Sequence, residues 1–282
     1  MSIDLILNGL QQGLVLAIIA CAIMIPFRFL DFADLTAEGA YPLGGAICAV
    51  CMSCCGLHPI AAIFLGVVGA GVMGVGTSLI HLKFNVNTML AGIILSTMGY
   101  SVNLRIMGRP NISLFECNGL FGPSIHANIL VLSSILLLLI IPLALFLRTD
   151  FGLRFRAVGL NQNFAKKQGI SLDKNTMLGM FVAGGLSGLA GSLMVQLQSY
   201  MDVGMGVGIL IHGLASLMIG EAILGKSTLD RQLAAPVLGA LLYQQIQGIA
   251  LSLGLAPSDL KFFTGSIVLI VIALQRKTGR NA

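Results

Sequence analysis

Polar side chains recur at helical spacing inside several apolar runs of this sequence, and they are the residues best placed to do chemistry. They are, run by run, Ser96, Tyr100 and Asn103; His212 and Ser216; and Gln244 and Gln247. Residues three or four positions apart share one face of a helix. Such a stripe can line a solvated path through a membrane, or it can hold neighbouring helices together by hydrogen bonds. Both interpretations stay open, and the first predicts a translocation path.

Two carboxylates, Glu38 and Glu221, fall inside apolar runs, and we expect both near the inner end of their spans. A carboxylate in a membrane needs a cation or water beside it. We assign Glu38 to the predicted path. A proton relay would need more such groups along the path, and carboxylates near the bilayer midplane, which would favour ion-driven transport, are not expected.

No catalytic or metal-binding constellation is found in the sequence. It lacks the HExxH motif and the GxSxG motif, and its four histidines are scattered. A cluster of four cysteines has no histidine or carboxylate among it, so its role stays open. It comprises Cys48, Cys51, Cys54 and Cys55. We therefore expect no enzyme activity, no metal and no cofactor on this chain.

The composition places the chain in a membrane. It is 56% hydrophobic and 10% charged, with a mean hydropathy of +0.95. A span needs roughly 20 mostly apolar residues, and the sequence predicts an all-α polytopic membrane protein with about nine spans, some broken or re-entrant. They are 5–25, 36–54, 59–80, 88–107, 128–147, 176–198, 206–224, 233–252 and 262–275. The whole chain, 1–282, is expected to form a single transmembrane domain.

Basic residues predict the orientation of the chain. Six of its sixteen Lys and Arg residues lie in the polar loop 148–174, and positive loops stay in the cytoplasm. With this loop inside, only Arg105, Arg109 and Lys261 lie outside, which predicts an external N-terminus and a cytoplasmic C-terminus. The basic residues flank apolar runs instead of forming one patch, so nucleic-acid binding is not expected.

Small residues recur at helical spacing through several spans, for example at Gly66, Ala70, Gly74 and Ser78. Such ridges favour close packing between helices in lipid. The two halves of the chain, each with an aspartate before a short glycine-containing span, also predict an inverted repeat.

Two loops differ in character. Within 148–174, Asn161 is a good helix N-cap and Gly169 a good helix end, so residues 161–168 are predicted to form a short helix with Lys166 and Lys167 in its last turn. The external loop 107–127 contains prolines and glycines that prevent one continuous helix. It is either a docking surface or a plain connector.

The central loop resembles that of bacterial ABC importer permeases of the branched-chain amino acid and ribose permease family. The matching runs are TDFGLRFRAVGLNQNFAKKQGI at 149–170, FVAGGLSGLAGSL at 181–193 and, more weakly, FADLTAEGAYPLGGAI at 32–47, where Asp31 precedes the run at a position that is usually Asn. The subgroup it most resembles is that of tryptophan- or tyrosine-type permeases. The resemblance covers nearly the whole chain.

This resemblance implies that residues 161–168 form a coupling helix that docks on an ATPase. The residues carried over to ATPase coupling are Arg156, Ala157, Asn161, Ala165 and Gly169. The contact is expected from the small residues Ala157, Ala165 and Gly169. It also implies an external solute-binding protein, for which Arg105, Arg109 and Glu116 are candidate contacts.

The resulting prediction is a permease subunit that pairs with a second copy of itself in the bacterial inner membrane. Two cytoplasmic ABC ATPases would carry ATP and Mg, and an external binding protein would deliver a small polar solute, such as an amino acid. The alternative is an ion-driven secondary transporter.

Overall fold

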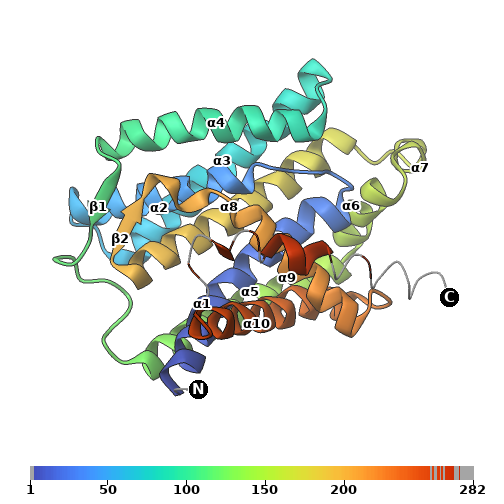
Figure 1. Cartoon of the computed structure of the whole chain (residues 1–282). Helices are drawn as coiled ribbons and strands as arrows, with labels where there is room; N and C mark the ends of the chain where they lie inside the picture. The colour runs from blue at the N-terminus through green and yellow to red at the C-terminus, as the bar shows by residue number, and fades with distance from the viewer. Residues whose placement is uncertain are drawn as a thin grey trace. The chain divides into compact units, whose positions relative to one another are not determined.

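A computed structural model describes residues 3–254 and, beyond them, residues 256, 259, 260, 262, 264–269 and 273. The elements, in chain order, are α1 (Ile3–Met24), the π-helix η1 (Ile25–Phe29), α2 (Ala37–Ser53), α3 (Pro59–Phe84), α4 (Thr88–Met107), β1 (Asn111–Ser113), α5 (Ile125–Arg148), α6 (Asp150–Leu160), α7 (Gln162–Lys167), α8 (Leu172–Gln198), β2 (Tyr200–Asp202), the 3₁₀-helix η2 (Val203–Gly206), α9 (Ile209–Leu224) and α10 (Leu229–Ser252) (Figure 1). The chain is therefore mostly helical, as predicted.

The number of spans differs from the prediction. Each of the first eight predicted spans coincides with a helix, but in the described part of the chain only six segments are long and apolar enough to cross a membrane. The helix α2 has 17 residues, and α10 carries four glutamines, so neither qualifies. Of the ninth predicted span, 262–275, residues 262, 264–269 and 273 are described as helical, and the others lie outside the described residues. Nine spans are thus not confirmed, and the inverted repeat stays a prediction.

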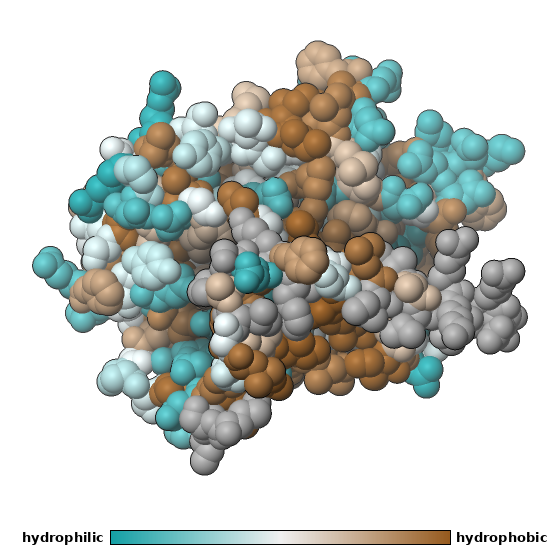
Figure 2. All heavy atoms as spheres, viewed as in Figure 1, coloured by the Kyte–Doolittle hydropathy of each residue, from teal (hydrophilic) through white to brown (hydrophobic). Residues whose placement is uncertain are grey.

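The chain divides into two compact units. One comprises residues 22–122 and 145–209, and the other residues 1–21, 123–144 and 210–282. In the first unit α2, α3 and α8 pack against one another, and α4 packs on α2 and α3 (Figure 1). Figure 2 shows apolar side chains over α4, where Leu90 and Met98 are exposed, as expected for a surface that faces lipid or another membrane helix.

Close packing in the first unit depends on glycines, as the small-residue ridges predict. A Cβ on Gly74 in α3 would lie 2.0 Å from the Met180 carbonyl oxygen in α8. A Cβ on Gly191 in α8 would lie 1.9 Å from the Tyr41 carbonyl oxygen in α2. Hydroxyl groups add to this packing, because Ser192 donates a hydrogen bond of 3.0 Å to the Gly44 carbonyl.

The first long helix is broken before α2. The π-helix η1 follows α1 directly, and residues 31–35 have no regular structure. Asp31 has φ = +50°, a conformation that Asp and Asn adopt more readily than most residues. The helix α2 then begins beside α4, where a Cβ on Gly39 would lie 2.7 Å from the Ser96 Cα atom. Ser96 is the ninth residue of the twenty-residue α4, so α2 begins near the middle of that span.

The loop after α4 contains the only strand pairing among the described residues. β1 pairs antiparallel with β2, with Ile112 opposite Met201 and both side chains buried. Asp202 then caps the following turn by accepting a hydrogen bond of 2.6 Å from the Gly204 amide. The predicted external loop is therefore anchored to the chain segment that follows α8.

In the second unit α9 and α10 are in close contact through two glycines. A Cβ on Gly220 would lie 1.8 Å from the Ala235 carbonyl oxygen, and a Cβ on Gly239 would lie 1.8 Å from the Ser216 carbonyl oxygen. The carboxylate of Glu221 pairs with Lys226 at 3.3 Å, although its own side chain is only 2% exposed. The expected cation beside this buried carboxylate is therefore confirmed.

Candidate functional site

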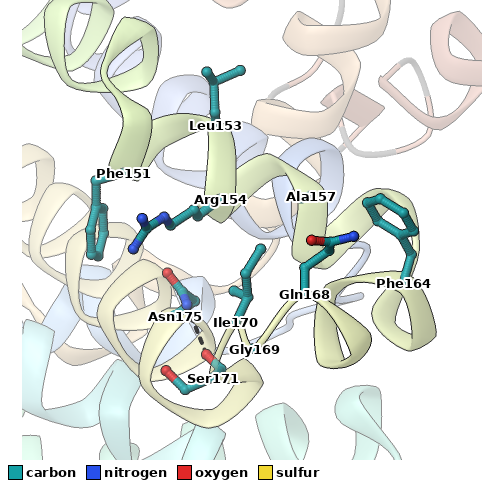
Figure 3. A pocket seen from close by; sticks show the side chains of 10 residues that line it. All are labelled: Phe151, Leu153, Arg154, Ala157, Phe164, Gln168, Gly169, Ile170, Ser171 and Asn175. Carbon is teal, nitrogen blue, oxygen red and sulfur yellow. Dashed lines mark hydrogen bonds between the residues drawn. The ribbon is translucent and has the colours of Figure 1, made fainter.

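The helices α6 and α7 form one wall of a cavity of about 690 Å³ in the first unit. Its lining comes from α6, α7 and the start of α8, and comprises Phe151, Leu153, Arg154, Ala157, Phe164, Gln168, Gly169, Ile170, Ser171 and Asn175. Figure 3 shows the guanidinium group of Arg154 extending from α6 toward the side formed by Phe151 and Asn175. An open cavity edged by charged, amide and aromatic groups suits contact with another protein surface.

Asn161 joins the two helices. Its backbone N–H donates to the Ala157 carbonyl at 3.1 Å and ends α6, while its side-chain oxygen accepts from the Phe164 amide at 2.9 Å and begins α7. One residue therefore caps both helices and fixes the angle at which α7 leaves α6. The helix predicted at 161–168 is confirmed, with Asn161 as N-cap and Gln168 as C-cap.

Gly169 ends α7 in a Schellman motif. It has φ = +73°, its N–H donates to the Lys166 carbonyl at 3.0 Å, and the Ile170 N–H donates to the Ala165 carbonyl at 3.0 Å. A side chain at Gly169 would be strained in this conformation. Lys166 and Lys167 occupy the last turn, where they complement the helix dipole, and Figure 2 shows hydrophilic side chains gathered around α7.

The predicted coupling residues play different parts in this geometry. Ala165 is fully buried, so it seats α7 on its own unit and presents no surface to a partner. This corrects the expectation that Ala165 makes the contact itself. The neighbouring residue Phe164 is 55% exposed and lines the cavity, so it is the α7 side chain that presents an apolar surface there. Arg156 is partly buried, and its Nε atom has no hydrogen-bond partner among the described residues.

The α6 helix packs directly against the broken region of the first helix. A Cβ on Gly159 would lie 2.3 Å from the Phe29 carbonyl oxygen in η1, and Gly179 in α8 faces Leu30 and Phe155. Because backbone contacts backbone here, a displacement of α6 must also displace η1. Only residues 30–36 connect η1, which makes this contact with α6, to the start of α2.

A second cavity, of about 260 Å³, lies at that start of α2. Its polar lining is Glu38, Ser96, Thr97 and Tyr100, and its other lining residues are Gly39, Pro42, Val203, Gly206 and Val207. Three residues of the predicted path, Glu38, Ser96 and Tyr100, therefore share one cavity. Asn103 lies on α4 one turn beyond Tyr100, fully buried, and its amide has no hydrogen-bond partner among the described residues.

The depth of Glu38 differs from the prediction. Because α2 begins near the middle of α4, Glu38 lies near mid-height of that span and not at its inner end. The sequence pattern misses this depth, since it treats 36–54 as a full span that begins at the membrane surface. Non-helical backbone at such depth is tolerated where it is buried or lines a cavity.

The remaining predicted path residues lie in the other unit. Gln244 and Gln247 line a cavity of about 470 Å³ together with residues of α1, and Gln244 donates a hydrogen bond of 2.7 Å to Gln12. The His212 ring stacks at 5.7 Å from Tyr243. Ser216 is fully buried at the contact of α9 with α10 and donates to the His212 carbonyl, which fits a packing role better than a path.

The candidate contacts for an external protein are all accessible. Arg105, Arg109 and Glu116 are exposed at the end of α4 and in the following loop, next to β1. Phe115, 78% exposed, lies beside them and was not predicted.

Sequence analysis also misses the buried carboxylate of Asp34. Its Oδ1 atom accepts hydrogen bonds from the amide and the hydroxyl of Thr36, and the Thr36 hydroxyl lies 2.7 Å from that of Thr77. This network holds the non-helical segment before α2 against α3. The Asp-x-Thr spacing next to the start of an apolar run is the signal that predicts such a turn.

Comparison with known proteins assigns the family. The family model described as "Branched-chain amino acid transport system / permease component" matches residues 5–273. The chain belongs to this family. It is a permease subunit of an ABC transporter, embedded in a membrane through its apolar helices.

Curated proteins from three bacteria are similar to this permease in sequence. It is 35% identical over 268 residues to a tyrosine transport system permease protein of Clostridioides difficile (strain R20291), covering 95% of this chain and 90% of that protein. It is 30% identical over 275 residues to an uncharacterized protein, RP368, of Rickettsia prowazekii (strain Madrid E), covering 96% and 97%. A nucleoside ABC transporter permease of Lactococcus lactis subsp. cremoris (strain MG1363) is 27% identical over 200 residues, covering 69% of this chain and 50% of that protein.

Two solved structures share the fold of the permease. One is of a metal-chelate type ABC transporter in an inward-facing conformation, with a TM-score of 0.53, 16% identity, and coverage of 97% of this chain and 85% of that one. The other is PsaBC from Streptococcus pneumoniae in complex with Fab, with a TM-score of 0.51, 15% identity, and coverage of 95% and 89%.

Proposed function

We propose that this permease forms, with a second copy of itself, the solute path of an amino-acid importer in a bacterial inner membrane, with the N-terminus outside and the C-terminus in the cytoplasm. Two cytoplasmic ATPase subunits would dock on α7 and its cavity, and an external binding protein would deliver the solute. The chain itself would hold no cofactor, since ATP and Mg would bind the ATPases.

The observation that carries the proposal is the construction of α6 and α7. A six-residue helix fixed at both ends, with an exposed phenylalanine beside a 690 Å³ cavity, is a rigid projection that another protein can push. The contact of Gly159 with Phe29 leads from this projection to η1, and the chain continues from η1 to the Glu38 cavity. ATP-driven motion would reach the solute path by this route.

The choice of solute is supported by the relatives. The C. difficile protein, similar along nearly the full length of both chains, is named for tyrosine transport. The nucleoside permease is more distant and is matched over half its length. An aromatic amino acid is therefore the first solute to test.

One observation favours the second candidate, an ion-driven transporter. Glu38 lies near mid-height of α4, where such transporters place carboxylates. Against it, a coupled ion path needs several such groups, whereas Glu221 pairs with Lys226 and the Asp34 carboxylate is bound by the amide and hydroxyl of Thr36.

Docking of an ATPase at α7 can be tested by photo-crosslinking in the native membrane. A benzoylphenylalanine placed at the exposed Asn163 in α7 is expected to capture a nucleotide-binding protein, identified by mass spectrometry. The same probe at Phe115, 78% exposed in the external loop, should not capture it. Crosslinks from Asn163 to lipid alone, with the chain correctly inserted, would contradict the proposed docking.

A further inference from the structure

The Glu38 cavity contains a carboxylate that has no basic partner in the described part of the chain. The Glu38 Oε1 atom accepts a hydrogen bond of 3.2 Å from the Gly208 amide, and among the described residues no Lys or Arg forms an ion pair with it. Its position in the first turn of α2 places the carboxylate at the positive end of the helix dipole. Glu221, by contrast, pairs with Lys226. A carboxylate near the middle of a span needs a cation or water beside it, and a cationic ligand would supply the cation.

The serine and threonine hydroxyls of the cavity add acceptors and not donors. Ser96 and Thr97 both donate their hydroxyl hydrogens to the Ile93 carbonyl within α4. Their lone pairs therefore remain for a ligand that donates hydrogen bonds. Tyr100 is 50% exposed and offers an aromatic face, which also attracts a cation. Carboxylate, hydroxyl lone pairs and ring together match a group that carries three N–H donors and a positive charge.

The cavity has the size of a small solute. Its 260 Å³ lies just below the range of about 300–1,000 Å³ found for drug-sized ligands. Pro42, Val203 and Val207 provide apolar lining, against which the carbon part of a solute can pack. An inorganic cation would leave that apolar lining unused.

We propose that this cavity binds the primary ammonium group of the transported solute, with Glu38 as its counter-charge and Ser96, Thr97 and Tyr100 around it. This proposal rests on the proposed function, because only that function makes the bound amine a transported solute. The cavity thereby selects for amines inside the membrane, in addition to any selection by a binding protein.

The experiment uses a thiol in the cavity, in the purified permease complex in nanodiscs. Thr97→Cys is introduced after Cys51, Cys54, Cys55 and Cys117 are replaced by serine, and its reaction with aminoethyl and sulfonatoethyl methanethiosulfonate is timed. The cationic reagent is expected to be favoured, and Glu38→Gln should lower the ratio of the two rates by roughly tenfold, the effect of losing one charged hydrogen-bond partner. Asp230→Asn, which also removes a carboxylate from the first turn of a helix, should leave the ratio unchanged.

Protection of the same thiol identifies the ligand group. Tyramine, which has the amine of tyrosine, is expected to slow the labelling, and 3-(4-hydroxyphenyl)propanoate, which lacks the amine, is not. Equal protection by both compounds, or amine protection that survives Glu38→Gln, would overturn the ammonium site even if ATP-driven uptake is observed. Amine-selective protection in a complex that shows no ATP-driven uptake would leave the site standing and sink the proposed function.

Discussion

Replacing Phe164 with aspartate is expected to abolish solute-stimulated ATP hydrolysis by the purified permease complex, with a loss of at least roughly tenfold. Phe164 is the exposed aromatic residue of α7 and lines the cavity at its side, and buried aromatic anchors carry a large share of the binding energy at protein interfaces. The substitution places a charge at the proposed contact while leaving Asn161, Gly169 and the helix ends intact. The measurement is ATP hydrolysis with and without tyrosine and the binding protein.

A matched control separates docking from general damage. Phe84, 73% exposed at the end of α3, lies outside the α6–α7 cavity, so Phe84→Asp should retain stimulation. Retained stimulation in Phe164→Asp, in a complex of normal composition, would show that α7 is not the coupling contact. Loss of stimulation in both variants would likewise remove the evidence for a specific role of α7.

Replacing Gly191 with alanine is expected to remove most of the folded protein. The added Cβ would lie 1.9 Å from the Tyr41 carbonyl oxygen, so backbone would meet backbone where α8 crosses α2. Neither backbone can rotate away as a side chain could, and overpacking of this kind lowers the free energy of unfolding by about 1–3 kcal/mol or more. The measurement is the yield of monodisperse protein after detergent extraction and its thermal midpoint.

The control is Gly185→Ala in the same helix. A Cβ at Gly185 would lie 3.4 Å from Val67, an ordinary van der Waals contact. Because alanine is the better helix former, this change should be neutral or slightly stabilising. If the two variants behaved alike, the close contact of α8 with α2 would be wrong.

Local patterns in the sequence are sufficient to predict the eight long helices that coincide with predicted spans, and α7, but they do not predict α6 or η1. The apolar runs, and Asn161 and Gly169 at the ends of 161–168, are interactions within a few residues of one another, and the structure confirms them. The small-residue ridges likewise indicate packing, which Gly74 and Gly191 provide. The helical periodicity of small residues predicts this packing because it depends only on which face of a helix each residue occupies.

Contacts distant in the sequence are what sequence patterns cannot supply. The burial of Ala165, the contact of Gly159 with Phe29 and the mid-span depth of Glu38 all depend on where other helices lie. Hydropathy does predict an interruption at 26–35, between the spans 5–25 and 36–54, but it does not show that this interruption ends near the middle of α4. That break brings Glu38, Ser96 and Tyr100 to one cavity, whereas Ser216, with the same polar spacing, is fully buried between helices.

The central claim is that ATP hydrolysis on docked subunits drives solute through this permease. The most direct measurement is tyrosine uptake into proteoliposomes that contain the complex, with the binding protein supplied on the external side of the permease and ATP on the side of α7. The proposed function predicts uptake that requires hydrolysable ATP and persists when proton and sodium gradients are collapsed. Uptake that proceeds without ATP and stops when those gradients are collapsed would contradict it and establish the ion-driven alternative.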